Sequence, residues 1–147
     1  MAAFVRRSTA VWHGTGKDGS GHLSTTSGVL ADTPYNFMAR FVSEDGRAGT
    51  NPEELLGAAH AGCFTMALSF QLAGAGFTPE ALTTVAHVSL EKKDAGFEVV
   101  GIRLQLTGKV PGIGAEQFQQ LAANAKVGCP ISKALAAVPI TLDATLA

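Results

Sequence analysis

The stretch NPEELLGAAHAGCFTMALSFQLAGAG (51–76) decides how the rest of this chain must fold. Its first residues suit the start of a helix, because Asn51 can cap the helix and Pro52 fits the first helical position. Two glutamates follow and favour the positive end of the helix dipole. Glycines near the end of the stretch can terminate the helix. The pattern predicts a helical segment over residues 51–73, either continuous or broken near Gly57 or Gly62.

This helix carries no charge between Glu54 and Glu80 and approaches the length that spans a membrane. It nevertheless contains His60, Gln71 and several glycines, and acidic rather than basic residues precede it. We therefore interpret it as a buried central helix. A helix that is apolar on almost every side must be covered on every side.

The residues before the helix predict a β-meander. Short runs of β-branched and aromatic residues at 4–12, 22–29 and 35–42 read as strands. Turn-forming segments, GTGKDGSG (14–21) and ADTP (31–34), separate them. The glycine-rich segment lacks the GK[ST] ending of a phosphate loop and leads into a strand, so it is interpreted as a hairpin turn.

The residues after the helix alternate between strand and helix patterns. We expect strands at 83–92, 97–110 and 139–147, with helices at 115–126 and within GCPISKAL (128–135). The order β-β-β-α-β-β-α-α-β predicts an α+β fold with largely antiparallel sheets. A chain of 147 residues without a linker predicts a single domain, 1–147.

Composition narrows the class of function. The chain is 46% apolar and has 11 basic against 12 acidic side chains, which argues against a nucleic-acid-binding protein. The N-terminus, MAAFVRRSTAVWHG, has no apolar run long enough for a secretory signal. Two cysteines are too few for a disulfide framework and are typical of a reducing compartment. We expect a cytoplasmic protein.

The two cysteines, Cys63 and Cys129, are too far apart in sequence to form a CxxC motif. Either one alone could be a small buried hydrophobic residue. Cys129 precedes Pro130 and can occupy a helix N-cap, where the helix dipole favours a thiolate. Local physics therefore predicts that Cys129 is the more acidic thiol.

His60 and Cys63 lie three residues apart on one helical face, which is half of a possible zinc site. The usual close second pair of ligands is missing. We expect no bound metal, and we interpret His60 as a helix residue with satisfied hydrogen bonds rather than as a metal ligand.

Two blocks of sequence resemble the OsmC/Ohr family of thiol-dependent hydroperoxide reductases. The block RFVSEDGRAGTNPEELLGAAHAGCFTMAL (40–68) resembles the family signature, and AKVGCPISKAL (125–135) matches the block of its second cysteine. STTSGVL and PYNFMARF resemble the OsmC branch. The resemblance covers essentially the whole chain. It implies an OsmC-like fold, with sheets packed around central helices, in an intertwined homodimer.

The resemblance also implies roles for individual residues. Cys63 matches the peroxidatic cysteine and Cys129 the resolving cysteine. Glu53 matches the acidic residue that forms a salt bridge with a catalytic arginine, and Arg40 matches the OsmC-branch position of that arginine. In the Ohr branch the arginine comes from the glycine-rich turn, where this sequence has Lys17.

The implied function is a peroxidase that reduces organic hydroperoxides to alcohols, without a cofactor. Cys63 would form a sulfenic acid, and a disulfide with Cys129 would follow. A dithiol, which is a lipoylated protein in related enzymes, would then reduce the disulfide. Apolar neighbours such as Leu55, Phe64 and Met66 could line a pocket for alkyl peroxides. The alternative is a non-catalytic stress-induced binding protein on the same scaffold.

The spacing of Glu53 and Cys63 constrains the assembly. They are ten residues apart, which is roughly 15 Å along a continuous helix. Either Arg40 bridges part of this distance, or the acidic residue comes from a second subunit. Two such helices packed antiparallel about a two-fold axis near Ala58 would bring Glu53 of one protomer close to Cys63 of its partner. We therefore expect active sites at a subunit interface.

Overall fold

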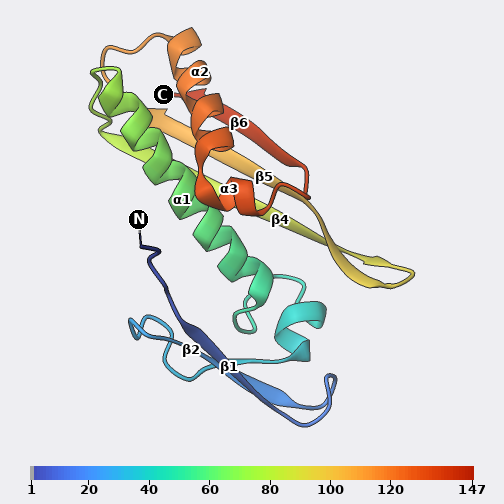
Figure 1. Cartoon of the computed structure of the whole chain (residues 1–147). Helices are drawn as coiled ribbons and strands as arrows, with labels where there is room; N and C mark the ends of the chain where they lie inside the picture. Colours follow the sequence, from blue (N-terminus) through green and yellow to red (C-terminus); the bar gives the residue numbers. More distant parts are fainter. Residues whose placement is uncertain (1) are drawn as a thin grey trace. The chain divides into compact units, whose positions relative to one another are not determined.

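The computed structural model describes residues 2–147 and divides into two compact units, Met1–Pro52 and Glu53–Ala147. Each unit contains its own three-stranded sheet, with strand orders β1-β2-β3 and β4-β5-β6 (Figure 1). The elements follow one another as the sequence predicts, with one short helical turn added before the long helix. The α+β class is confirmed.

The first unit is the predicted antiparallel meander, formed by β1 (Ser8–His13), β2 (Ser20–Thr25) and β3 (Thr33–Tyr35). Segment 14–21 supplies the hairpin turn between β1 and β2, as expected. Gly21 lies between the rings of Trp12 and Tyr35, whose centroids are 5.3 Å apart. A Cβ at this position would lie 2.6 Å from both rings, so the sheet needs glycine there.

The prediction of a strand over 35–42 was wrong. β3 ends at Tyr35, and η1 (Met38–Val42) forms one turn of wide helix. The Asn36 side chain starts this turn by accepting a hydrogen bond from the Ala39 amide at 2.9 Å. The rings of Phe37 and Phe41 then pair at 5.1 Å, one helical turn apart. These local contacts outweigh the β propensity of the aromatic residues.

The first two strands are also shorter than predicted. β1 begins at Ser8 rather than at residue 4, and β2 ends at Thr25 rather than at residue 29. The chain turns after Thr25 because its amide donates to the Leu30 carbonyl at 2.9 Å. Gly28 occupies the left-handed region within this turn, at φ 79°.

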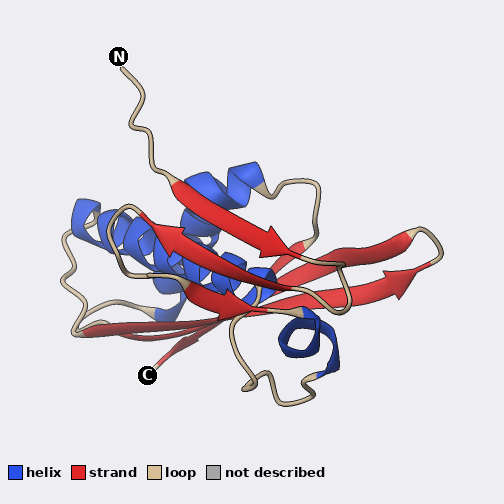
Figure 2. Cartoon of the chain, turned by 90° about the horizontal axis from the view of Figure 1, so that it is seen from below, coloured by secondary structure: helices blue, strands red, loops and turns tan. Residues whose placement is uncertain are grey.

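The second unit contains the long helix α1 (Pro52–Gly74), which runs without a break. β4 (Ala81–Lys93) and β5 (Gly96–Lys109) form an antiparallel hairpin, whose tip extends past the helices of this unit in Figures 1 and 2. α2 (Ala115–Gly128) and α3 (Pro130–Ala134) then cross over to β6 (Ile140–Leu146). Parallel neighbours need a long crossover connection, and the two helices supply it. β6 accordingly pairs with β5 in parallel. This sheet is mixed.

The core of the second unit lies between one face of its sheet and the helices. Leu104 and Leu106 on β5 are fully buried against residues of α1 and α2. The opposite face of the sheet is polar, and Arg103 pairs there with Asp143 at 3.0 Å. The main core residues are Phe64, Leu68, Leu72, Ile102, Leu104, Leu106, Val110, Phe118, Ala122, Ala125 and Cys129.

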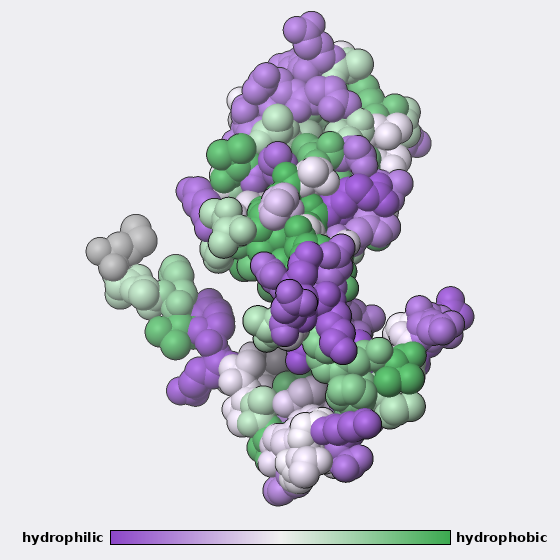
Figure 3. Space-filling view, turned by 90° about the vertical axis from the view of Figure 1, so that its right-hand side faces the viewer, coloured by the Kyte–Doolittle hydropathy of each residue, from purple (hydrophilic) through white to green (hydrophobic). Residues whose placement is uncertain are grey.

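Only one face of α1 is buried within the chain. Its buried residues recur every three or four positions, at 57, 60, 64, 68 and 72. On another face Met66 is 63% exposed and Phe70 is 71% exposed. Hydrophobic side chains therefore reach the surface among polar ones, as Figure 3 shows. Within this single chain, the cover predicted for every side of the helix extends over one face alone.

By length and composition α1 could also cross a membrane. It is the one helix of residues 2–147 that passes this test, with a mean hydropathy of 1.3. The core helix of a soluble protein passes the same test, so the measure does not separate the two. The fully buried His60 in its middle and the packing of Phe64, Leu68 and Leu72 into the core favour a core helix.

We expect Gly108→Ala to destabilise the protein by about 1–3 kcal/mol. The added Cβ would lie 2.6 Å from the ring of Phe118, which is fully buried and cannot move aside freely. Urea unfolding followed by circular dichroism measures the change. The matched control is Gly101→Ala on the same strand, whose Cβ meets only the Pro139 carbonyl oxygen at 3.8 Å. We expect its stability to change by no more than about 0.5 kcal/mol, and equal effects would contradict this packing argument.

Candidate functional site

The two cysteines, 66 positions apart in sequence, meet in the second unit. The sulfurs of Cys63 and Cys129 are 2.8 Å apart, and both thiols are free. Cys63 is partly exposed on α1, whereas Cys129 is fully buried. This contact confirms the expectation that the two sulfurs come together.

Cys129 is held where α2 ends and α3 begins. Its amide donates to the Ala125 carbonyl at 2.9 Å, and its own carbonyl accepts from the Lys133 amide at 3.1 Å. Pro130 occupies the first position of α3, so the sequence Cys-Pro separates the two helices. The backbone of Cys129 is therefore fixed by both helices, and its side chain is directed at α1.

A hydrogen bond of 2.8 Å joins the two sulfurs. The thiol contact could be donated from either side, since a thiol is both donor and acceptor. Burial alone raises the pKa of Cys129, but a hydrogen bond from Cys63, the amide and hydroxyl of Ser132, and the Ile131 amide lower it below its usual value. Burial and then the contact with Cys129 raise the pKa of Cys63. Cys129 is the more acidic thiol, as local physics predicted.

A buried polar pair lies beside the cysteines. His60 on α1 is 0% exposed, and its Nε2 lies 2.8 Å from the hydroxyl of Ser132 on α3, which is 6% exposed. Within residues 2–147 its Nδ1 has no hydrogen-bond partner. Burial lowers the pKa of His60, so the imidazole is neutral at pH 7. The expectation of a satisfied histidine holds for one nitrogen only.

Ser132 is the residue that sequence reasoning missed. It stands three positions after Cys129, which caps α3. A polar side chain at that position faces back toward the cap, as in a capping box. The spacing Cys-Pro-x-Ser was therefore the available signal.

Of the other two predicted site residues, Glu53 lies in the first turn of α1 and Arg40 lies in η1. The unbroken helix keeps Glu53 roughly 15 Å from Cys63 along its axis. Arg40 belongs to the first unit, in η1, where its guanidinium lies 4.8 Å from the centroid of the Phe41 ring. Among residues 2–147 no three His, Cys, Asp or Glu side chains form a group that could hold a metal ion.

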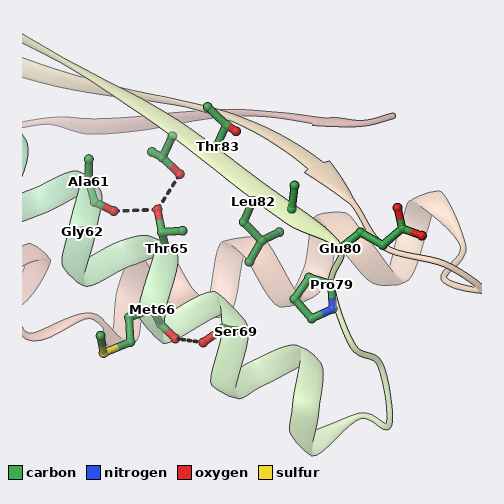
Figure 4. A pocket seen from close by; sticks show the side chains of 11 residues that line it. Ala61, Gly62, Thr65, Met66, Ser69, Pro79, Glu80, Leu82 and Thr83 are labelled. Atoms are coloured by element: carbon green, nitrogen blue, oxygen red, sulfur yellow. Dashed lines mark hydrogen bonds between the residues drawn. The ribbon is translucent and has the colours of Figure 1, made fainter.

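An open cleft of about 660 Å³ lies between α1 and the start of β4 (Figure 4). Thr65 donates to the Ala61 carbonyl at 2.6 Å and lies 2.7 Å from the Thr84 hydroxyl inside it. Met66 lines this cleft, whereas Phe64 packs into the core. Phe64 and Met66 leave the helix on different faces. The prediction that Phe64 lines a pocket for alkyl peroxides together with Met66 was therefore wrong.

Comparisons with known proteins show the family to which the chain is similar. Residues 44–143 match the family model described as OsmC-like protein. The chain is 52% identical to Peroxiredoxin OsmC of Escherichia coli, over 94% of each chain. It is 32% identical to the organic hydroperoxide resistance protein OhrB of Bacillus subtilis, over 78% of this chain and 81% of that protein.

Solved structures show the same fold. The organic hydroperoxide resistance protein OsmC of Legionella pneumophila superposes with a TM-score of 0.72 at 26% identity, over 99% of both chains. The paired cysteines, the order of the elements and these similarities agree with one another. The chain belongs to the OsmC-like protein family.

Proposed function

We propose that this protein is a thiol-dependent peroxidase that reduces organic hydroperoxides to alcohols. The observation that carries the proposal is the pair of free thiols with sulfurs 2.8 Å apart. The 52% identity to a protein named Peroxiredoxin OsmC supports it. A binding protein on the same scaffold would have no need for two reduced sulfurs in contact.

Cys63 is the residue that attacks the peroxide in this proposal. It is the partly exposed thiol, and a substrate can reach it, whereas Cys129 is sealed in the core. The Cys63 thiolate attacks the distal peroxide oxygen, the O–O bond breaks, and the alkoxide leaves and takes a proton to become the alcohol. Cys63 is left as a sulfenic acid. Cys129 then forms the disulfide, and an external dithiol restores both thiols.

A cation beside Cys63 is needed for this chemistry. Within the second unit Cys63 has a raised pKa, so it is the wrong thiol to be ionised first. Lowering a thiol pKa from 8.5 to 6 raises its thiolate fraction about 30-fold, while its nucleophilicity falls about ten-fold. Most of the rate must therefore come from stabilising the departing alkoxide. A guanidinium can do both.

We assign this guanidinium to Arg40, with Glu53 orienting it through a bidentate pair. The assignment follows the positions of the two residues in the family signature. It places no demand on Glu53 to reach Cys63, which the length of α1 forbids within one helix. The cycle needs no metal or organic cofactor. A dithiol such as a lipoylated protein is the proposed reductant, and a reducing cytoplasm suits both thiols.

Cys63→Ser should abolish turnover of tert-butyl hydroperoxide, because a hydroxyl cannot be oxidised to the sulfenic acid. A coupled assay with a dithiol reductant measures the rate. Cys129→Ser is the matched control, and it should still consume about one equivalent of peroxide per protein in a single turnover. Activity that survives in Cys63→Ser would refute the assignment. Failure of the wild type to lose two thiols after one equivalent of peroxide would favour the binding protein.

Arg40→Met should lower kcat/KM for tert-butyl hydroperoxide on the order of 10²-fold, since it removes the donors that stabilise the alkoxide. Steady-state kinetics measures this loss. Arg47→Met, seven positions away in an exposed loop, is the matched control and should retain the wild-type rate. A normal rate in Arg40→Met together with a large loss in Lys17→Met would move the role to the glycine-rich turn.

We also propose that two chains form an intertwined homodimer in which residues 1–147 act as one domain. Exposed apolar side chains support this, because they lie on both units. On α1 these are Met66 and Phe70, and in the first unit Met38 is 59% exposed and Val29 is 82% exposed. Gly21 and Ala39 are the buried residues among positions 2–50, which is little core for a sheet of this size.

Sedimentation equilibrium should show a dimer at micromolar concentration, and Phe70→Glu should raise its dissociation constant at least about ten-fold. The reason is that a charge would replace an aromatic side chain on the face of α1 that the partner protomer covers in the proposed dimer. Val127→Glu is the control, because Val127 is equally exposed, at 69%, on α2. A monomeric wild type, or equal weakening by both substitutions, would remove this face from the interface.

A further inference from the structure

We propose that His60 and Ser132 form a buried hydrogen-bond relay that stabilises negative charge on the sulfur of Cys129. The two residues then act on the second half of the reaction, when Cys129 attacks and later leaves as a thiolate. Neither residue touches the peroxide. Both are positioning residues, and the inference rests on the proposed peroxidase function.

The relay is a line of polar atoms in an apolar surrounding. His60 Nε2 lies 2.8 Å from the Ser132 hydroxyl, and the sulfurs of Cys129 and Cys63 lie 2.8 Å apart. Ser132 stands three positions after Cys129 at the start of α3, and its amide and its hydroxyl both lie within hydrogen-bonding reach of the Cys129 sulfur. His60, Ser132 and Cys129 are 0%, 6% and 0% exposed, so water competes little for these contacts.

The unpartnered ring nitrogen fixes the direction of the relay. If the neutral imidazole carried its proton on Nδ1, a buried N–H would have no acceptor among the described residues. Ser132 would then have to donate to Nε2. With the proton on Nε2 the ring donates to Ser132, and the serine proton is free to point at Cys129. A buried acceptor without a partner costs less than a buried donor without one. The relay therefore runs from His60 through Ser132 to sulfur.

A thiolate on Cys129 is what disulfide formation requires. Its electron pair attacks the sulfur of the Cys63 sulfenic acid, the S–O bond breaks, and hydroxide leaves and takes a proton from solvent to become water. The new bond is the Cys63–Cys129 disulfide. Without the relay fewer donors would oppose the effect of burial, so the pKa of Cys129 would be higher and the sulfenic acid would last longer.

The same charge directs the reduction of the disulfide. The thiol of lower pKa is the better leaving group in thiol–disulfide exchange. One thiolate of an external dithiol therefore attacks the sulfur of Cys63, which is the partly exposed one, and the S–S bond breaks with its electron pair going to Cys129. The second thiol of the reductant then attacks the mixed disulfide on Cys63 and releases the free thiol. The relay predicts a mixed disulfide on Cys63 and none on Cys129.

The first test measures Cys129 directly. In a Cys63→Ser background Cys129 is the remaining thiol of the chain, and the ultraviolet absorbance of its thiolate can be titrated against pH. We expect Ser132→Ala in this background to lower the thiolate fraction at pH 7 about ten-fold, the effect of one hydrogen bond to a charged group. Ser132→Thr, which keeps the hydroxyl, should restore it. An unchanged titration curve in a folded Ser132→Ala protein would overturn the relay.

The second test follows the reaction with both cysteines present. In Ser132→Ala and His60→Leu, Cys63 should react with one equivalent of tert-butyl hydroperoxide at the wild-type rate. Its sulfenic acid, trapped with dimedone, should last several times longer. His60→Gln keeps a donor near the position of Nε2 and should recover much of the disulfide rate. His87→Gln is the matched control, because His87 is an exposed histidine paired with Gln105 at 3.1 Å on the outer face of the sheet.

The outcomes separate this inference from the function on which it rests. Slower peroxide attack with an unchanged lifetime of the sulfenic acid would overturn the relay and leave the peroxidase intact. A wild type that keeps both thiols after one equivalent of peroxide would refute the peroxidase function, and the titration of Cys129 would still report on the hydrogen bonds around its sulfur.

Discussion

The packing of one face of α1 against the sheet and α2 is the constraint on which the site depends. Residues 60, 64, 68 and 72 are buried together, so the rotation of the helix about its axis is fixed by large apolar side chains. Cys63 precedes Phe64 and is carried to the edge of this buried face. Its sulfur then meets Cys129 at 2.8 Å without any loop having to move. A rotation of α1 about its axis would both expose Phe64 and move the two sulfurs apart.

The two thiols have different surroundings, and this difference divides the work between them. Cys129 caps a short helix and is surrounded by donors, so negative charge is favoured there even though the residue is buried. Cys63 gains no comparable help within its unit, and its pKa is raised. The thiol that can reach a substrate is thus the one that needs an external cation. In the proposed reaction, which begins at Cys63 and ends at Cys129, the second step uses the environment of Cys129 and the first step needs the added cation.

The proposed homodimer would cover apolar surface that this chain leaves open. The first unit has two small buried residues among positions 2–50, and α1 exposes Met66 and Phe70. A small sheet cannot stabilise itself with so little buried area. Burial of these surfaces by a second copy would supply the missing area.

The sequence by itself determined the order of the elements, the helix that begins at Pro52, and the two cysteines as the residues to examine first. These follow from periodicity, turn chemistry and a resemblance that needs no coordinates. It failed where local side-chain contacts compete with propensity, as at Asn36 and Phe37, which turn an apparent strand into η1. The parallel pairing of β5 with β6 could not be predicted from the sequence either, because the path of the crossover depends on how the helices pack.

Only the tertiary structure decided which polar groups share the buried space around the sulfurs. His60 and Ser132 are 72 positions apart, and neither lies in a sequence motif that indicates the other as its partner. Their contact exists because α1 and α3 pack closely enough to exclude water, and that exclusion gives a single hydrogen bond its influence on a thiol. Sequence spacing can place a side chain on a face of a helix. The packing of the core determines which residues that face contacts.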